Sequence, residues 1–495
     1  MRGRLPHIVF VFVCIVFTAV VVGRAQAARP ILAQAPAISA AVGAKPAHIM
    51  RPGLAPAFPV PPPFPSPTPI PPPLPLAPAF GAVPGWLHTS GIQILDARGR
   101  PVRLAAVNWY GAEGSDFVFG GLAYRPYMDI LRTIKRLGFN TVRIPFSNQI
   151  VEQDPIVVRH LEANPQLRGL HAMAILDRII AGARQIGLMV ILDNHRSEAG
   201  WTAQENGLWY DLPRYTPQSW INDWVNVARR YANNPAVVGF DLRNEPHSNG
   251  PKEEYVSNGY LRNGAVWGPF KGVEDPSRDW RLAAEQAGNA ILAVNPRVLI
   301  IVEGTQIYPY ANPAPTQNCP LNHAPAYQNY CNDLYWWGGN LAGAKDFPVI
   351  LNVPHQLVYS PHEYGPQMHG QRWIVPTMTE ADWQHQMYKH WGYLLQATGP
   401  SAAPIWIGEF GTPTWTSKDV YDTRGDSQGR WFSALVDYLR LNPSVGWGYW
   451  SINGTQSSTG GRAYGARDSF GLLTRDWAHV ALPPLVTSLK SISPR

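Results

Sequence analysis

The stretch VVGFDLRNEPH, Val237 to His247, sets a run of apolar residues directly before a cluster of polar and charged ones. Its first half has the composition of a buried strand, whereas its second half carries Asp241, Arg243, Glu245 and His247. Charged groups are costly to bury without partners, so a strand that lay wholly inside a core would not end in this way. The stretch therefore predicts a buried strand whose carboxyl end faces a cleft.

The same alternation recurs from about Gly85 onward, where apolar strand-like runs are separated by helix-like segments. Continuous apolar runs are typical of parallel strands that are buried on both faces. Eight such strand–helix units in about 400 residues predict an α/β fold, a (β/α)₈ TIM barrel with inserted loops and an irregular fifth unit. The alternative is a doubly wound open sheet, but no Gly-rich dinucleotide fingerprint follows the first strand.

The pattern also predicts boundaries for these elements. A hairpin with its turn at Ala97–Gly99 precedes the barrel. The expected strands are Val102–Asn108, Asn140–Ile144, Leu188–Asp193, Ala236–Leu242, Val298–Val302, Leu357–Ser360, Ile405–Ile407 and Val445–Tyr449. The expected helices are Tyr124–Leu137, Met173–Ile186, Ser219–Ala232, Trp280–Val294, Ala381–Ala397, Trp431–Leu441 and about Ala478–Ser491.

Composition narrows the kind of ligand. Only 15% of the 495 residues are charged, whereas the chain contains 19 Trp and 49 Pro. The formal net charge is +7, but the basic residues are spread along the chain and do not form the cluster that a nucleic-acid footprint shows. This profile favours a neutral polar ligand and argues against nucleic acid as a partner.

Residues 1–27 have the organisation of a signal peptide. Arg2 and Arg4 form a basic region, Ile8–Val22 is an apolar region broken only by Thr18, and Ala25–Ala27 fits the small-x-small cleavage pattern. The apolar region is short for a spanning helix, which needs about 20 residues, so an uncleaved anchor is the less favoured alternative. Either way we expect an exported protein, secreted or periplasmic, with no stable membrane partner once the signal is cleaved.

Residues 28–84 form a low-complexity segment rich in proline. The segment has no apolar period that would suit a strand or a helix, and proline at this density favours extended polyproline II. We therefore expect a disordered Pro-rich linker that acts as a tether. One folded domain over residues 85–495 is expected to follow it.

The functional site of a (β/α)₈ barrel lies at the carboxyl ends of its strands, so the residues that close each apolar run are candidates. Each of them alone could have an ordinary structural role, such as a buried ion pair or a core aromatic. Their joint occurrence at the ends of most strands favours a functional site. The candidates are Trp109, Arg143, His195, Asn244, Glu245, His362, Tyr364, Glu409 and Trp450.

Two of these candidates, Glu245 and Glu409, predict paired-carboxylate chemistry in which one carboxyl is protonated and the other is ionised. Arg143 and Tyr364 can keep one member of the pair anionic, and Asn244 can hold a substrate hydroxyl. Tryptophan rings offer flat apolar faces that suit the C–H faces of sugar rings. Trp450 is the best-placed platform, and the further candidates are Trp109, Trp209, Trp336 and Trp337.

The motifs at the strand ends resemble those of glycoside hydrolase family 5, the cellulase family of retaining (β/α)₈ β-glycanases. They are NTVRIPFS, LDNHR, GFDLRNEPH, SPHEYG, WIGEFG and GYWSING, in this order. The longer stretches WWGGNLAGAKDFPVILNVPHQLVYSPHEY and DWRLAAEQAGNAILAVNP resemble the secreted bacterial endoglucanase branch of the family. The resemblance covers nearly all of residues 85–495, which it marks as the catalytic domain, and none of the Pro-rich segment.

The resemblance implies a retaining endo-1,4-β-glucanase that acts on cellulose or related β-glucans without a metal or an organic cofactor. Glu245 matches the acid/base of the family and Glu409 its nucleophile. We expect a monomer whose partner is a β-glucan polysaccharide or oligosaccharide. The segment SEAGWTAQENGLWY after His195 departs from the family pattern, so outer-subsite preference does not carry over. The residues that match the substrate-binding shell are Arg143, His195, Asn244, His362, Tyr364 and Trp450.

Three other functions remain open from the sequence. A β-mannanase, or another β-glycosidase of the same family, would share these motifs. A metal-dependent barrel hydrolase could use His195 and His362, although no HxH stands at a strand end and Arg and Trp are poor neighbours for a cation. A non-catalytic sugar-binding barrel is disfavoured because both glutamates are present.

Cysteine usage gives a testable prediction. Cys14 leaves with the signal peptide, so Cys319 and Cys331 remain as an even pair in an oxidising compartment. They flank a loop-like stretch, and a zinc pair is the weaker alternative because no CxxC accompanies them. We expect a disulfide between them, and therefore no free thiol in an Ellman titration of the unfolded, unreduced mature protein. Two free thiols would contradict the pairing.

Overall fold

The computed structural model describes residues 84–248, 264–269, 276–311, 330–371, 373–457 and 463–494, all within one compact unit. The predicted signal peptide lies outside these residues, as do Cys319 and all of the predicted linker except residue 84. The signal peptide, the linker and the disulfide therefore stay predictions. Within the described part of the chain, no helix combines the length and the apolar character that crossing a bilayer requires.

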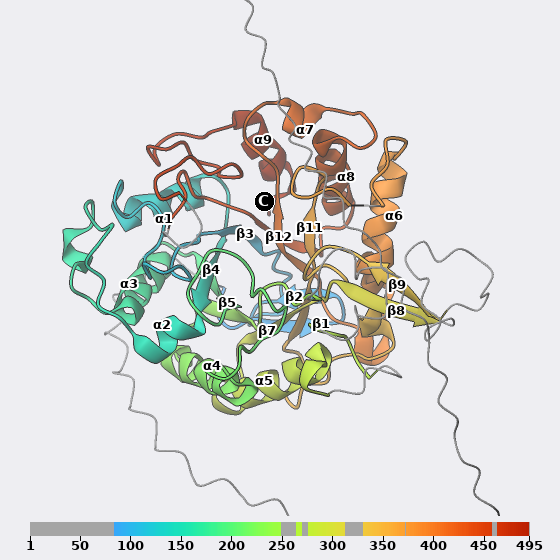
Figure 1. The fold of residues 1–495 in the computed structure, drawn as a ribbon, viewed down its shortest axis with the longest axis horizontal. Coiled ribbons are helices and arrows are strands. Elements are labelled where there is room, and N and C mark those ends of the chain that lie inside the picture. Colours follow the sequence, from blue (N-terminus) through green and yellow to red (C-terminus); the bar gives the residue numbers. More distant parts are fainter. Residues whose placement is uncertain are drawn as a thin grey trace, which may run out of the picture. The chain divides into compact units, whose positions relative to one another are not determined.

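Nine parallel strands form one sheet that curves into a barrel, and helices surround it (Figure 1). The strands are β3 Ala105–Asn108, β4 Thr141–Ser147, β5 Met189–Arg196, β6 Val237–Asp241, β7 Leu299–Glu303, β10 Leu357–Ser360, β11 His362–Tyr364, β12 Trp406–Gly411 and β13 Gly446–Tyr449. Their order in the sheet is β10-β7-β6-β5-β4-β3-β13-β12-β11.

The two outermost strands of this order, β10 and β11, are segments of one barrel strand divided at Pro361. β10 pairs with β7 and β11 pairs with β12, while Tyr359 of β10 also bridges Ile405 next to β12. Proline has no backbone N–H for a ladder, so the break falls where the strand passes from one neighbour to the other. The barrel is therefore closed by eight strands, and the predicted (β/α)₈ fold is confirmed.

Helices alternate with the barrel strands, and several of them begin at a residue whose side chain caps the first turn. The hydroxyl of Thr216 accepts the backbone N–H of Ser219 at the start of α4, and α6 begins with a capping box between Thr379 and Asp382. The helices in the described residues are α1 Tyr127–Arg136, α2 Asn148–Gln153, α3 Ala172–Gln185, α4 Pro217–Tyr231, α5 Trp280–Val294, α6 Glu380–His390, α7 Lys418–Tyr421, α8 Gln428–Leu441 and α9 Pro483–Ile492.

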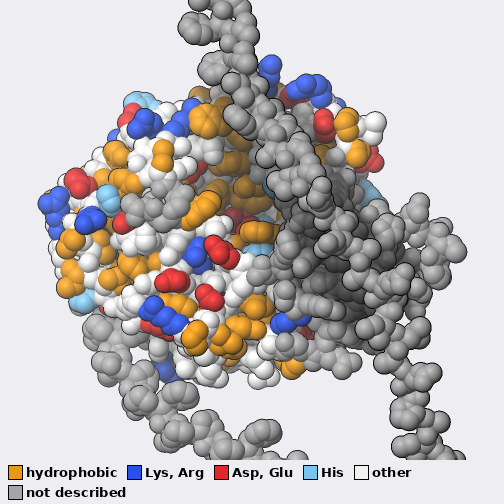
Figure 2. All heavy atoms as spheres, in the orientation of Figure 1, with side chains coloured by type: hydrophobic (Ala, Val, Ile, Leu, Met, Phe, Trp, Pro, Cys, Tyr) orange, Lys and Arg blue, Asp and Glu red, His pale blue; other side chains and the backbone are white. Residues whose placement is uncertain are grey.

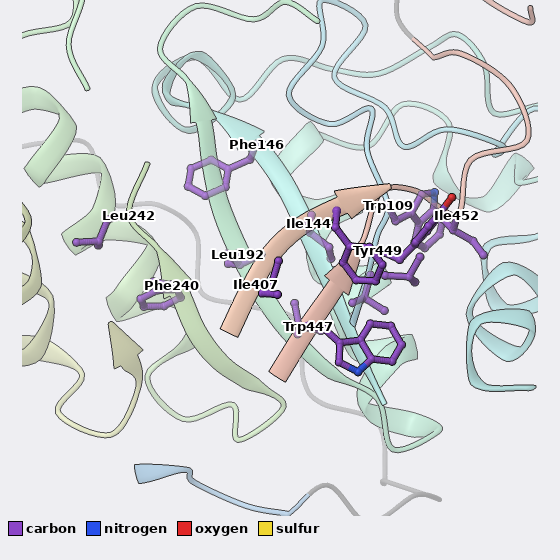
Figure 3. Packing of buried hydrophobic residues seen from close by; sticks show 14 of the residues in the cluster. Trp109, Ile144, Phe146, Leu192, Phe240, Leu242, Ile407, Trp447, Tyr449 and Ile452 are labelled. Atoms are coloured by element: carbon purple, nitrogen blue, oxygen red, sulfur yellow. The ribbon is translucent and has the colours of Figure 1, made fainter. Parts of the chain in front are cut away.

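Apolar side chains form two separate layers. The larger layer lies between the barrel and the helices, and Figure 3 shows part of it around Phe240, Trp447 and Tyr449. The smaller layer fills the amino-terminal half of the barrel interior. A hairpin of β1 (His88–Ser90) and β2 (Gln93–Leu95) contributes Ile94 to this layer and so closes that end of the barrel.

The side chains that point into the barrel are apolar at the start of the strands and charged at their carboxyl ends. Met189 and Ile191 belong to the inner layer, so Asp193, two residues further along β5, points to the same side. In β7, Leu299 and Ile301 belong to the inner layer, and Glu303 follows them on that side. Charged side chains therefore occupy the interior at the carboxyl ends of the strands.

Several predicted boundaries are wrong. The last helix begins at Pro483, because consecutive prolines fit only the first turn of a helix. The helix predicted to reach Ala397 ends at His390, and a 3₁₀ turn follows from Gly392, a poor helix former. The irregular fifth unit contains an antiparallel pair, β8 (Ile307–Ala311) and β9 (Tyr330–Leu334).

The first hairpin also differs from the prediction. Its strands pair His88–Ser90 with Gln93–Leu95. The predicted turn at Ala97–Gly99 is present as well: Leu95 pairs with Pro101, and backbone hydrogen bonds join Asp96 to Arg100 and Val102 to Ile94.

A buried ion pair between α3 and α4 gives a stability prediction. Asp177 accepts hydrogen bonds from Arg230 and Tyr231 at 2.6 to 2.9 Å. Both charged side chains are at most 7% exposed, so Asp177→Ala takes a buried carboxylate away from its cation and should cost about 3–5 kcal/mol of unfolding free energy. Asp129→Ala, which breaks an exposed pair with Arg132, is the control and should cost under about 1 kcal/mol. Urea unfolding measures both, and equal losses would contradict the prediction.

Candidate active site

The carboxyl ends of the strands carry a charged cluster around one guanidinium, that of Arg143 in β4. Arg143 is fully buried, and its nitrogens lie 2.6 to 3.2 Å from oxygens of four acids. It also donates to the side-chain oxygens of Asn108 and Asn244, at 2.9 and 3.1 Å. The four acids are Asp193, Asp241, Glu303 and Glu409.

Three of these acids hold protons more readily than acids in water. Burial raises the pKa of Asp193 and of Asp241 to about 7 and that of Glu303 to about 8, although Arg143 acts in the opposite direction. A carboxylate in a low-dielectric interior loses its hydration, which favours the neutral form. The charge of the cluster therefore depends on the cations beside it.

Glu409 in β12 is the acid that ionises most readily. Burial acts against its charge, but the cations His362 and Arg143 lower the pKa of Glu409 below its usual value. Arg143 donates to Oε1 at 2.6 Å, and the hydroxyl of Tyr364 donates to Oε2 at 2.8 Å. Two donors on two oxygens fix the orientation of this carboxylate and favour its negative charge.

Glu245, which follows β6, lies in a different environment. Burial raises its pKa, and the nearby charge of Glu409 adds to the rise, so it holds a proton more readily than Glu409. Its side chain is 17% exposed and can be reached from the surface. Its backbone has a φ of 50°, in the left-handed region that residues other than glycine rarely adopt.

The two glutamates face each other across a short gap. One carboxylate oxygen of Glu245, one of Glu409 and a ring nitrogen of His362 all lie within 4.8 Å of one another. A separation of at most 4.8 Å between these oxygens is compatible with the roughly 5–5.5 Å between the acids of retaining glycosidases and short of the roughly 6.5–9.5 Å in inverting ones. Figure 2 shows one face of the molecule, on which hydrophobic side chains gather in a recess near the centre.

His362 in β11 lies between three acids. Its Nδ1 is 3.1 Å from Glu245 and 3.8 Å from Glu409, and its Nε2 is 3.1 Å from Glu303. Burial acts against a charged ring, but the carboxylates of Glu303 and Glu409 raise the pKa of His362 well above its usual value. The imidazole is therefore positively charged at neutral pH.

His195 and Trp450 form an aromatic side of the site. Their rings stack with centroids 5.7 Å apart, and Tyr110 stacks on the Trp450 ring at 5.2 Å. Nδ1 of His195 lies 2.7 Å from Asp193, and burial lowers the pKa of His195 to about 4. His195 is therefore neutral at pH 7. The indole of Trp450 is only partly buried.

Trp109 is not available as a sugar platform in this structure. Its indole is fully buried, packs edge-on against Phe119 and donates from Nε1 to the carbonyl of Gly120. The residue therefore anchors the loop after β3 from inside the core, which corrects the sequence prediction.

The loop tryptophans differ in exposure. Trp209 and Trp336 are buried in the large apolar layer, so neither indole is exposed to stack on a sugar ring as the sequence predicted. Trp337 is 37% exposed and stacks flat on His247, with ring centroids 3.7 Å apart. Of these three, only Trp337 offers a free ring face at the carboxyl ends of the strands.

The sequence prediction omits Asp193, Asp241 and Glu303. Each of them closes an apolar run, so the signal that identified Glu409 also identifies these three. The prediction passes over Glu303 because the fifth unit is irregular. It passes over the two aspartates because more familiar motif residues, His195 and Asn244, follow within three positions.

Two groups of three side chains among the described residues could share a metal ion. They are Asp241 with Glu303 and His362, and Glu245 with His362 and Glu409. Both groups need His362 as a ligand, and a metal binds only the neutral imidazole. The acidic neighbours of His362 instead favour its protonated ring. Arg143 already supplies positive charge to three of these four acids, Asp241, Glu303 and Glu409. The donor set therefore fits the cations of the chain better than a metal.

Comparisons with known proteins find glycoside hydrolases that are similar to this chain. The family model Cellulase (glycosyl hydrolase family 5) matches residues 95–456. An endoglucanase of Paenibacillus polymyxa is 36% identical over 402 residues, which cover 80% of this chain and 84% of that protein. The major extracellular endoglucanase of Xanthomonas campestris pv. campestris is 32% identical over 395 residues, which cover 78% of this chain and 67% of that protein.

A solved structure is similar as well. An endocellulase from Pyrococcus horikoshii, in a complex with cellotetraose, is 33% identical and superimposes with a TM-score of 0.65. The match covers 84% of this chain and 100% of that chain.

Removal of Arg143 should make stability fall more steeply as the pH rises. Asp193, Asp241 and Glu303 have raised pKa values in the folded chain. Groups of this kind contribute stability below the unfolded pKa and lose it as the pH rises through the folded pKa. Without the guanidinium these values rise further, so Arg143→Met should cost about 3–5 kcal/mol at pH 7 and less at pH 5.

Melting temperatures between pH 5 and pH 8 measure this effect. Arg100→Met, which breaks a pair in which Arg100 is largely exposed, is the control and should show a small loss that does not change over this range. A gap between wild type and Arg143→Met that stays constant or narrows with rising pH would refute the argument.

Proposed function

Because the chain belongs to glycosyl hydrolase family 5, the cellulase family, we propose that it is an exported endo-1,4-β-glucanase that retains anomeric configuration. The observation that carries the proposal is the pair Glu245 and Glu409. Their carboxylates approach within 4.8 Å, and their pKa values are shifted in opposite directions. Two acids at this spacing, one protonated and one ionised, suit a double displacement.

Glu409 is the nucleophile of the first step. Its ionised carboxylate attacks the anomeric carbon and forms a glycosyl ester, while the bond to the oxygen of the departing sugar breaks. Glu245 donates its proton to that oxygen, which leaves as a hydroxyl. Arg143 and Tyr364 hold the two oxygens of Glu409, so the attacking lone pair has a fixed direction.

Glu245 is the base of the second step. Having lost its proton, it takes one from a water molecule, and the resulting nucleophile attacks the anomeric carbon. The ester bond breaks, Glu409 leaves as a carboxylate, and Glu245 is protonated again. The charged ring of His362, 3.1 Å from Glu245, stabilises the ionised form of Glu245 between the two steps.

Aromatic and polar side chains next to the pair bind the glucan. The partly buried ring of Trp450, backed by Tyr110, offers a flat face to a sugar ring. Neutral His195, with Nδ1 on Asp193, can present Nε2 to a sugar hydroxyl. Trp337 provides a second platform on the side of β6 and β7.

Export is supported by two independent observations. The first 27 residues have the basic, apolar and small-residue regions of a signal peptide. A relative that is 32% identical is named as an extracellular endoglucanase.

A polysaccharide panel on the purified mature protein tests the substrate class. We expect reducing ends to appear fastest on carboxymethyl-cellulose and mixed β-glucan, and slowly or not at all on mannan and xylan. Viscosity should fall early in the reaction, because an endo-acting enzyme cuts inside chains. Faster hydrolysis of mannan than of cellulose would replace the proposal with a β-mannanase.

Azide rescue tests the roles of the two glutamates. Glu409→Ala removes the nucleophile, so turnover should fall about a thousandfold or more, and azide entering the vacated space should give an α-glycosyl azide. Glu245→Ala should still form the ester with an activated aryl cellobioside, and azide should then release a β-glycosyl azide without needing a base. The wild-type enzyme with azide is the control and should release only sugar. If both variants gave the same anomer, the assignment of the two roles would be wrong.

A further inference from the structure

The carboxylate of Glu303, at the end of β7, makes three contacts with the catalytic cluster. Its Oε2 accepts a hydrogen bond from the backbone N–H of Glu245 at 2.7 Å. Its Oε1 lies 3.1 Å from Nε2 of His362 and 3.1 Å from a guanidinium nitrogen of Arg143. Glu303 is fully buried, so it reaches no substrate, and neither step of the double displacement uses it.

The first contact stabilises an unusual backbone. Glu245 has a φ of 50°, which is unfavourable for a residue with a side chain, and its N–H needs a partner in the interior. An oxygen of the Glu303 side chain, 2.7 Å away, is the partner of that N–H. Gly338 packs against the same place, since a Cβ there would stand 2.3 Å from Oε2 of Glu303 and 3.3 Å from Cα of Glu245. The carboxylate therefore has little room to move.

The second contact reaches Glu245 through an imidazole. Nε2 of His362 faces Glu303, and Nδ1 of the same ring faces Oε1 of Glu245. Rotation of the ring would break both contacts, so Glu303 fixes the donor that faces the carboxyl group of Glu245. Backbone and side chain of Glu245 are thus both tied to one buried carboxylate.

We propose that Glu303 is a positioning residue for the acid/base Glu245, and that it acts through the Glu245 backbone N–H and through His362. This inference rests on the proposed function, because it assumes that Glu245 transfers the proton. Glutamine is a sharp test, because its single oxygen can serve Glu245 or the donors of His362 and Arg143, but not both.

Glu303→Gln should slow the steps in which Glu245 donates or accepts a proton. It should spare the formation of the glycosyl ester from a substrate whose leaving group needs no proton. Cellopentaose has a poor leaving group that needs a proton, whereas 2,4-dinitrophenolate leaves unaided. We expect kcat/KM to fall about 100-fold for cellopentaose and to stay within about threefold of wild type for 2,4-dinitrophenyl β-cellobioside. With the aryl substrate, a burst of about one dinitrophenolate per enzyme should precede slow turnover, because the base is misplaced.

Two further variants keep the test decisive. Glu363→Gln is the matched control: Glu363 is equally buried and adjacent to His362, but it accepts hydrogen bonds from Tyr335, Trp391 and Trp431 between the barrel and the helices. It should affect both substrates equally. Glu303→Asp keeps the carboxyl group on a shorter side chain and should show a smaller loss with the same bias against cellopentaose. This variant provides the test if the Gln variant does not fold. Equal losses on both substrates in the Glu303 variants would overturn the inference.

Glu245→Ala, measured on the same two substrates, separates the two ways of failing. If this variant loses activity equally on both, the acid/base assignment itself is wrong. If it is selective for the poor leaving group while Glu303→Gln is not, the assignment stands and only the role of Glu303 is overturned.

Discussion

A buried guanidinium surrounded by carboxylates is the interaction on which this site depends. Arg143 lies within 3.2 Å of four acids and is itself fully buried. Each charge has lost its hydration, and only mutual attraction compensates for that loss. The second cation, His362, extends the network to Glu245. Without these two cations the acids would repel one another or take up protons, and the pKa of Glu409 would not lie below that of the neighbouring Glu245.

The barrel makes this cluster possible because it supplies rigid positions from separate strands. Arg143, Glu303, His362 and Glu409 lie within strands, and their side chains have little freedom. Glu245 is the exception, since it stands just beyond β6 with a left-handed backbone. In the proposed mechanism it is the residue whose proton moves, and it is held by contacts from other strands.

Much of the fold could be predicted from periodicity alone. Continuous apolar runs identified all eight barrel strands because burial on both faces leaves a direct trace in composition. The helix Trp280–Val294 and the strand Leu357–Ser360 were predicted to the residue. Boundaries failed where one residue overrides the pattern, as at Pro483, or where loops pair with each other, as in β8 and β9.

The sequence by itself determined which residues end the strands, and hence that Arg143, Glu245, His362 and Glu409 share one edge of the barrel. Only the tertiary structure decided what each of them does there. Three features depend on neighbours from distant parts of the chain. They are the burial of Trp109, the hydrogen bond between Glu245 and Glu303, and the opposite pKa shifts of Glu245 and Glu409. Strand periodicity is a local property of the sequence, whereas desolvation and charge–charge interaction are set by distances across the barrel.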